Sequence, residues 1–489
     1  MHSITVANDK ERRTMNSIIQ GKLAKNVLYN VAYQILLLIV PLITSPYISR
    51  VLGASGMGEY SYTHSVVYFF VLITMLGVLN YGNREISRVK DDPNKVTNVF
   101  WGIYSVQFFA GIISSLCYFF YLFFFCNEYK MVFFAQFLYL LGGLLDISWF
   151  YFGIEQFKTT TLISTVNKLL TTVLIFLVVK NSNHIYIYTL IIAGGYLLNQ
   201  ITYWFCIRKF IKSVNISISG IKHHFFPMLG LFIPVIAVSI YKYMDKIMLG
   251  FLIDSTEVGI YEAAEKFINL PLSIITAIGT VMLPRITNMQ VNNESRGIKK
   301  YNFISMVMIM FLSFGIAFGL GGISEVFIPW FYGAEFIASS NVLIILLPSV
   351  VFISWANVVR TQCLLPNKRD KEYCISVILG AIINLIINII LIPHYGASGA
   401  AIGTTIAEIS VCLVQCVAIR KSMEFSKYLR YCFPFIVTSI LMYFIILKIS
   451  FDSILRTIIL RIVIGAITYC LMSIYFLKKG LNEFKRMDN

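Results

Sequence analysis

The chain has 489 residues, of which 57% are hydrophobic and only 13% are charged, and its formal net charge is +16. Soluble domains carry about 25% charged residues, so this composition excludes a soluble globular protein and indicates a polytopic membrane protein. The basic residues are divided among many short segments, which excludes a nucleic-acid-binding surface. The cysteines are scattered without a Cys-x-x-Cys pair, which favours small buried side chains over metal or redox chemistry.

The hydrophobic residues gather in about fourteen segments that are long enough to cross a bilayer. Residues 1–25, which precede them, are polar and basic and lack a cleavage site, so we expect a cytoplasmic N-terminal segment rather than a signal peptide. The predicted spans are 26–48, 60–81, 99–125, 131–152, 161–179, 185–206, 228–250, 260–283, 302–323, 340–363, 373–393, 399–419, 431–450 and 456–477.

Lysine and arginine between the spans follow an alternating pattern. Most of them fall in the two terminal segments and the even-numbered connections, and few fall in the odd-numbered connections. The positive-inside rule therefore places both termini in the cytoplasm and predicts an even number of spans. We expect a multi-pass protein of the cytoplasmic (inner) membrane.

The chain also contains an internal repeat. Tyr60 and Tyr261 are 201 residues apart, and so are Arg84 and Arg285 at the cytoplasmic ends of the same two spans. The repeated unit holds six spans, so its copies are expected to be related by a pseudo-two-fold axis along the membrane normal. The predicted fold is all-α, with two six-helix bundles at 26–222 and 223–425, and with a C-terminal helix pair and cytoplasmic tail at 426–489.

Spans seven and eight carry six charged residues. A charge at mid-membrane costs at least about 2.5 kcal/mol unless it faces protein or water. Lys242 with Asp245, and Glu262 with Lys266, are three and four residues apart, a spacing that allows ion pairs along one helix. The set comprises Lys242, Asp245, Lys246, Glu262, Glu265 and Lys266. It is either an ion-pair network that fastens helices together or the wall of a substrate cavity or extracellular gate.

Isolated polar residues extend the candidate site. In the repeat alignment His64 of span two would face Glu265, and Arg50, on the outer side, is a further candidate for the cavity or gate. We expect Arg84, Arg285 and Arg360 at the cytoplasmic mouth, where arginine is also common for topology alone or because it reaches the interface.

One acidic residue lies deep in a span. Glu408 follows the helix break at Pro393–Gly396 and lies roughly 14 Å into the next helix, since each helical residue rises 1.5 Å. Like the other intramembrane charges, it is expected to face the protein interior or water.

Motifs of enzyme catalysis are missing from the sequence. It has no phosphate-binding loop, zinc-ligand spacing, nucleophile elbow or dinucleotide fingerprint, and no connection much longer than about twenty residues that could form a catalytic domain. We therefore expect neither an enzyme nor a cofactor or metal site. Any transport would draw its energy from an ion gradient, the membrane potential or removal of the product.

Seven motifs resemble those of the multidrug/oligosaccharidyl-lipid/polysaccharide exporter superfamily, and the chain is most similar to the Wzx-type flippases of bacterial polysaccharide assembly. The motifs cover spans one to twelve in the family's order. They are Ser49–Tyr60, Tyr81–Ile86, Trp149–Lys158, Asp245–Gly250, Val258–Tyr261, Leu283–Ile286 and Leu391–Ala401.

The resemblance implies two six-helix bundles around a central cavity and a flippase working by alternating access. The implied substrate is an oligosaccharide repeat unit linked to undecaprenyl diphosphate, for O-antigen, capsule or exopolysaccharide synthesis. A diphosphate requires cationic partners in a hydrated cavity, while the polyprenyl tail can stay in membrane lipid. The implied partners are the polysaccharide polymerase and glycosyltransferases of the pathway, and H⁺ or Na⁺ as coupling ion.

Three alternatives remain at this point. A lipid II flippase and an ion-coupled multidrug/cation antiporter belong to the same superfamily, and in an antiporter Asp245, Glu265 and Glu408 would be the cation sites. A membrane-bound polysaccharide polymerase or ligase would need a large external catalytic loop, which the sequence lacks.

Overall fold

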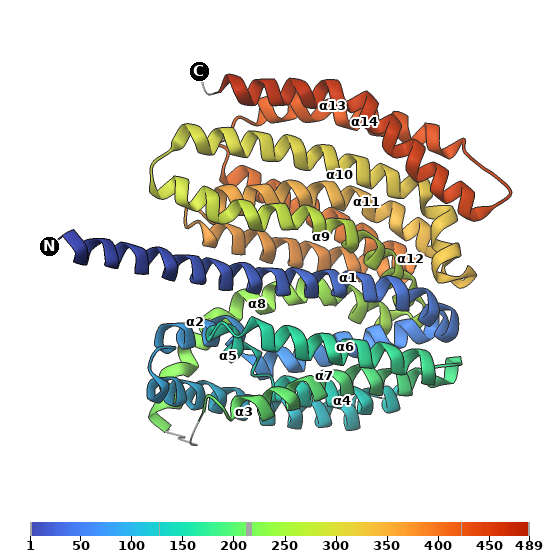
Figure 1. The fold of residues 1–489 in the computed structure, drawn as a ribbon. Coiled ribbons are helices and arrows are strands. Elements are labelled where there is room, and N and C mark those ends of the chain that lie inside the picture. Colours follow the sequence, from blue (N-terminus) through green and yellow to red (C-terminus); the bar gives the residue numbers. More distant parts are fainter. Residues whose placement is uncertain (1, 127, 212–217, 422, 488–489) are drawn as a thin grey trace. The chain divides into compact units, whose positions relative to one another are not determined.

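The computed structural model describes residues 2–126, 128–211, 218–421 and 423–487. Within these ranges the regular secondary structure is entirely helical, which confirms the all-α class (Figure 1). The chain divides into two compact units. The first comprises Met1–Val51 and Val66–Val235, and the second comprises Leu52–Ser65 and Ile236–Asn489.

Among the described residues, the first unit contains six α-helices of its own and parts of two α-helices that it shares with the second unit. Its central contacts join α4 with α7, α6 with α7, and α2 with α5. The shared helices are α1 (His2–Met75) and α8 (Ile218–Leu252), and the others are α2 (Val78–Val89), α3 (Pro93–Phe124), α4 (Lys130–Leu144), α5 (Ser148–Gly153), α6 (Phe157–Val178) and α7 (Ile185–Ile207).

A buried glutamine organises the core of the first unit. The predicted span 131–152 is interrupted between α4 and α5, which leaves carbonyl groups without helical partners. The side-chain amide of Gln107 donates to the carbonyls of Gly143 and Asp146, both at 2.9 Å, and its oxygen accepts from the Trp149 indole at 3.2 Å. Phe100 stacks on Trp149, so the break is held inside an aromatic core.

The N-terminus of α3 shows how the sequence places a helix start outside the apolar segments. Asp92 precedes Pro93, and its carboxylate accepts hydrogen bonds from the backbone N–H groups of Asn94 at 3.1 Å and Lys95 at 3.3 Å. These bonds satisfy two amides that have no partner within the helix. The bond from the Lys95 N–H is the main cause of the lowered pKa of Asp92.

Among the described residues, the second unit contains six further α-helices, the internal segment Leu52–Ser65 of α1 and the C-terminal part of α8. α10 packs against α9, α11, α13 and α14, and α11 packs against α12. Phe303, Met306 and Met310 of α10 are fully buried in an apolar core of this unit. The helices are α9 (Ser255–Val291), α10 (Ser295–Tyr332), α11 (Ile337–Val359), α12 (Asp370–Ala418), α13 (Phe425–Leu447) and α14 (Ile454–Arg486), with a π-helical turn at Arg360–Leu364.

Two glycines break long helices. Gly53 in α1 (φ 70°) and Gly396 in α12 (φ 52°) have left-handed backbone conformations, and each begins a Gly-Ala-Ser-Gly sequence. Glycine adopts this conformation without a steric penalty. The alanine N–H after each glycine donates to a carboxylate, at 2.9 Å to Glu335 and at 2.6 Å to Glu257. Each long helix is therefore two helices, the second of which is capped by a glutamate.

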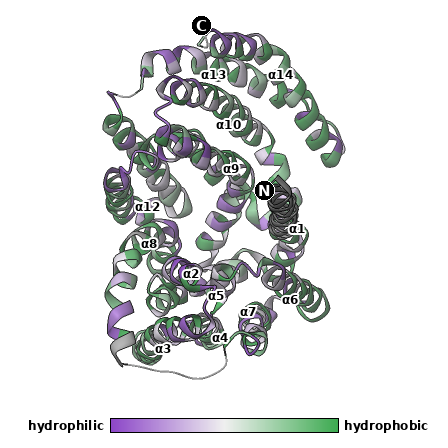
Figure 2. Ribbon diagram, turned by 60° about the vertical axis from the view of Figure 1, so that its left-hand side comes forward, coloured by the Kyte–Doolittle hydropathy of each residue, from purple (hydrophilic) through white to green (hydrophobic). Residues whose placement is uncertain are grey.

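The helix breaks at Gly53 and Gly396 affect how many membrane spans are counted. Within the described residues, eleven helical segments are long and apolar enough to cross a membrane, or twelve if the bent helix α8 is included. Figure 2 shows apolar residues along most of the helices in each unit. α1 and α12 each combine two helices, so the structure confirms a polytopic membrane protein, while the exact count of fourteen and the pseudo-two-fold symmetry stay predictions.

The last two helices are fastened to α10. Arg461 of α14 is buried and donates to the carbonyls of Gly322 at 2.8 Å and Ile449 at 2.9 Å. The Tyr469 hydroxyl donates to the Phe311 carbonyl at 2.6 Å. The C-terminal helix pair that the sequence predicts thus packs beside α10 in the second unit (Figure 1).

Candidate functional site

The second unit contains a cavity of about 640 Å³ with both charged and apolar residues in its walls. It is lined by residues of α8, α9, α11 and α12 and by the first residue of the π-helical turn. All six charged residues predicted from spans seven and eight line it, together with two further charged residues from later helices. The charged lining residues are Lys242, Asp245, Lys246, Glu262, Glu265, Lys266, Arg360 and Glu408.

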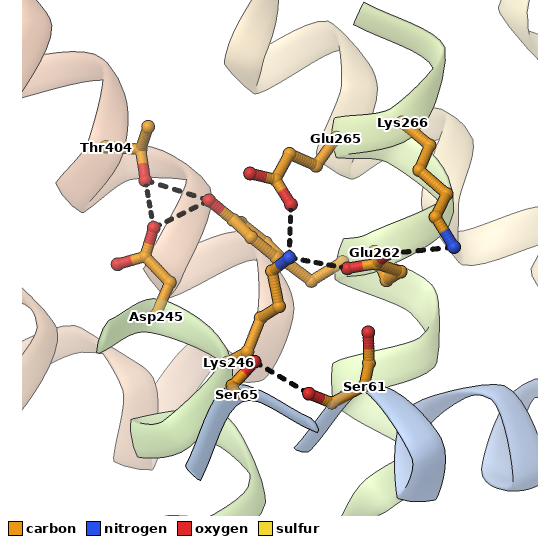
Figure 3. A network of polar contacts seen from close by, with 9 residues as sticks. Ser61, Ser65, Asp245, Lys246, Glu262, Glu265, Lys266 and Thr404 are labelled. Carbon is orange, nitrogen blue, oxygen red and sulfur yellow. Dashed lines mark hydrogen bonds and ion pairs between the residues drawn. The ribbon is translucent and has the colours of Figure 1, made fainter. Parts of the chain in front are cut away.

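Four of these side chains form one ion-pair network (Figure 3). The Lys246 ammonium lies 2.7 Å from a carboxylate oxygen of Glu262 and 2.9 Å from one of Glu265, and Lys266 pairs with the second oxygen of Glu262 at 2.9 Å. Lys246 is 8% exposed and Glu262 is 7% exposed. Two lysines thereby neutralise two glutamates, as a largely buried network requires.

Asp245 has a different environment from the one predicted. Its carboxylate accepts hydrogen bonds from the Tyr261 hydroxyl at 2.6 Å, the Thr404 hydroxyl at 2.5 Å and the Asn388 amide at 2.5 Å. The prediction of an ion pair between Asp245 and Lys242 is wrong, because donors from α9 and α12 occupy the carboxylate. Three hydrogen bonds satisfy an acidic side chain that is buried away from water.

Lys242 and Arg360 are the two lining cations without an ion pair in the described part of the chain. Lys242 is exposed toward the cavity. Arg360 donates to the Asn357 side chain at 2.9 Å, and its guanidinium lies 5.7 Å from the centre of the Tyr373 ring. Glu408 lies beside Tyr241 in the same cavity.

The other predicted site residues do not line this cavity. His64 stacks on Tyr60 with ring centres 5.6 Å apart and lies 6.5 Å from the Tyr243 ring. Arg285 donates to the Tyr301 hydroxyl and covers that ring at 4.0 Å. Their roles in a gate or a cytoplasmic mouth stay predictions.

Two predicted residues belong to the first unit. Arg50 is exposed on α1, and Arg84 of α2 lies 3.2 Å from Glu85 and 5.6 Å from the centre of the Tyr81 ring. The roles of Arg50 in the cavity or gate and of Arg84 at the cytoplasmic mouth also stay predictions.

Several neutral residues at the cavity were not predicted as site residues. Tyr261, Thr404 and Asn388 hold Asp245, and Asn357 contacts Arg360. The sequence does contain a signal for one of them, because Asn384 and Asn388 are polar residues four apart within an apolar helix. Within the described residues, no cluster of three or more histidine, cysteine, aspartate or glutamate side chains is placed to hold a metal ion.

An all-helical chain with many apolar spans and a polar cavity enclosed in the helices defines the class of polytopic membrane transporters. Residues 23–290, more than half of the chain, match the family described as polysaccharide biosynthesis protein, and the chain belongs to this family. The resemblance to Wzx-type flippases of the exporter superfamily is thereby confirmed.

Relatives of the chain carry the names of transporters and flippases. A protein of Escherichia coli (strain K12) named "Putative O-antigen transporter" is 25% identical over 400 residues, which cover 80% of this chain and 94% of the relative. A protein of Haloferax volcanii named "Probable low-salt glycan biosynthesis flippase Agl15" is 26% identical over 167 residues, which cover 34% of this chain and 35% of the relative. The names of these relatives are those of transporters and flippases rather than of enzymes, as the sequence predicts.

The fold is similar to two solved transporter structures. The lipid II flippase MurJ in an inward closed conformation has a TM-score of 0.73 at 20% identity, covering 93% of this chain and 99% of MurJ. An inward-facing multidrug resistance transporter of the MATE family has a TM-score of 0.58 at 11% identity, covering 78% of this chain and 97% of the transporter. At these identities the likeness concerns the fold alone.

Proposed function

We propose that this chain is a flippase that carries lipid-linked oligosaccharide repeat units across the bacterial cytoplasmic membrane, for O-antigen, capsule or exopolysaccharide synthesis. The observation that carries the proposal is the similarity to the E. coli protein named "Putative O-antigen transporter" over 94% of that relative's length. The carrier lipid is undecaprenyl diphosphate, and both termini of the chain lie in the cytoplasm.

The polar cavity of the second unit supports transport of a hydrophilic head group. Its volume of about 640 Å³ and its hydroxyl, amide and charged walls suit a diphosphate and the first sugars, which would otherwise lose their hydration in lipid. The polyprenyl tail stays among lipid chains. The flippase alternates between an inward-open and an outward-open state, so that the head group enters on one side and leaves on the other.

Asp245 and Glu408 are the acidic groups that we assign to ion coupling, with H⁺ or Na⁺ as the coupling ion. They line one cavity, and Asp245 is surrounded by hydroxyl and amide groups. An acidic group that gains and loses a cation during the transport cycle would tie head-group movement to an ion gradient. Association with the polysaccharide polymerase and glycosyltransferases of the same pathway completes the proposal.

The test is the fate of lipid-linked repeat units in cells depleted of this protein. We expect undecaprenyl-diphosphate oligosaccharide to accumulate on the cytoplasmic face while surface polysaccharide is lost. Normal surface polysaccharide with greater sensitivity to cationic drugs would overturn the proposal in favour of an antiporter. Lysis with loss of cell-wall synthesis would overturn it in favour of a lipid II flippase.

A further inference from the structure

The charges of the cavity are unevenly compensated. Lys246 and Lys266 pair with two glutamates, so the network at one part of the cavity presents little net positive charge to a ligand. Arg360 and Lys242 line the same cavity without an ion pair among the described residues. The carboxylates of Asp245 and Glu408 also line the cavity, and Glu408 lies near Lys242, so Arg360 is the lining cation that offers its charge to an anionic head group.

Arg360 is further distinguished by buried donors that have no acceptor. Asn357 is 4% exposed, and its side-chain oxygen is taken by the Arg360 guanidinium at 2.9 Å. The Asn357 amide nitrogen and the Arg360 Nε are both buried without a hydrogen-bond partner. Buried donors are nearly always satisfied in proteins, so two unsatisfied donors side by side on a cavity wall indicate a missing acceptor.

The backbone conformation at Arg360 also indicates a binding site. Arg360 begins the π-helical turn Arg360–Leu364, at the end of α11. Such insertions in α-helices are frequent at functional sites. Tyr373 of α12 lies against the guanidinium, with 5.7 Å between the guanidinium carbon and the ring centre, and limits the directions in which the arginine can point. A planar guanidinium held in this way matches the oxygens of a phosphate group.

We propose that Arg360 and Asn357 form a docking subsite for the diphosphate group of the lipid-linked substrate. This subsite rests on the proposed function, because the diphosphate belongs to the lipid-linked oligosaccharide that the flippase is proposed to carry. Arg360 supplies the positive charge and two or more donors, and Asn357 both orients the guanidinium and donates its own amide. The oligosaccharide then occupies the hydroxyl- and amide-lined remainder of the cavity.

The experiment measures lipid binding by the full-length protein in nanodiscs, with undecaprenyl diphosphate and uncharged undecaprenol as probes and native mass spectrometry as the readout. We expect Arg360→Gln to weaken binding of undecaprenyl diphosphate about tenfold to a hundredfold, the range for loss of hydrogen bonds between charged groups. Binding of undecaprenol should not change. Arg296→Gln, which removes an exposed charge from the first turn of α10, is the matched control and should bind both lipids as the wild type does.

A second variant keeps the test valid if Arg360→Gln does not fold. Asn357→Asp preserves the shape of the side chain but gives Arg360 an internal counter-ion and places a negative charge where the phosphate would lie. We expect it to weaken binding of undecaprenyl diphosphate as strongly as Arg360→Gln does. Equal affinities of either folded variant and the wild type for undecaprenyl diphosphate would overturn the subsite.

Inorganic pyrophosphate distinguishes a lipid-borne diphosphate from a soluble one. Weak competition by millimolar pyrophosphate, lost in Arg360→Gln, supports a subsite that needs the lipid tail for full affinity. Pyrophosphate that binds as tightly as the lipid would assign the subsite to a soluble anion and overturn the proposal. A wild-type protein that binds neither undecaprenyl diphosphate nor undecaprenol would instead contradict the proposed function itself.

Discussion

The ion-pair network at the cavity allows a prediction of how single substitutions change the free energy of unfolding. Replacing Lys246 with methionine removes the cation that pairs with Glu265 and one of two cations that pair with Glu262. Breaking a buried ion pair by removing one partner costs about 3–5 kcal/mol, and the 26% exposure of the Glu265 side chain places the expected loss near the lower end, about 3 kcal/mol. Lys266→Met should cost about 1 kcal/mol or less, because that side chain is 41% exposed and Glu262 keeps Lys246.

The assay is equilibrium unfolding of the purified protein by SDS in mixed micelles, with tryptophan fluorescence as the readout. Lys246→Met with Glu265→Gln removes one charge of each sign and should recover most of the stability lost in Lys246→Met. Equal destabilisation by Lys246→Met and Lys266→Met, or no recovery in the double variant, would refute the reasoning from burial and pairing.

The same double variant separates the two interpretations of the network. If the ion pairs only fasten α8 to α9, the restored fold should restore surface polysaccharide in cells that depend on the variant. If the charges form the wall or gate that the substrate passes, polysaccharide export should remain low although the protein is stable.

Three further predictions concern side-chain hydrogen bonds and a helix break that stabilise the second unit. Arg461→Met should lower the unfolding free energy by about 1–3 kcal/mol, because buried carbonyls lose their donor, and limited proteolysis should then cut the connection between α13 and α14 faster than in the wild type. Gly396→Ala should cost about 1–2 kcal/mol in SDS unfolding, because alanine disfavours a φ of 52° and its Cβ would clash with a carboxylate oxygen of Glu257. Thr404→Val should cost about 1.5–3 kcal/mol in the same assay, because the Asp245 carboxylate loses a donor, whereas Thr404→Ser should cost little, since it keeps the hydroxyl.

The sequence predicted the membrane class and the approximate positions of many helices because both depend on local composition. The spans expected at 431–450 and 456–477 correspond to α13 (Phe425–Leu447) and α14 (Ile454–Arg486), whose polar ends extend beyond the apolar stretch. The pair of Glu262 and Lys266 was predicted correctly because its members are four residues apart on one helix, so helical geometry alone brings them together.

The partners of Asp245 could not be predicted in the same way. Lys242 was the nearest candidate along the helix, but the carboxylate binds Asn388 and Thr404, which are 143 and 159 residues away in the chain. Tertiary packing decides such contacts, and a pattern within one helix carries no information about them. The unsatisfied donors at Arg360 and Asn357 are likewise visible only once α11 and α12 are packed together.

The ion pairs between α8 and α9 also bear on how the chain enters the membrane during synthesis. On its own, α8 would bring Lys242, Asp245 and Lys246 toward lipid, and each charge near the centre of a helix opposes insertion by about 2.5–3.5 kcal/mol. The neutralising residues Glu262 and Glu265 follow Lys246 by only 16 and 19 residues. We therefore expect the insertion machinery to hold α8 until α9 has emerged and to release the two helices into the bilayer together as a hairpin.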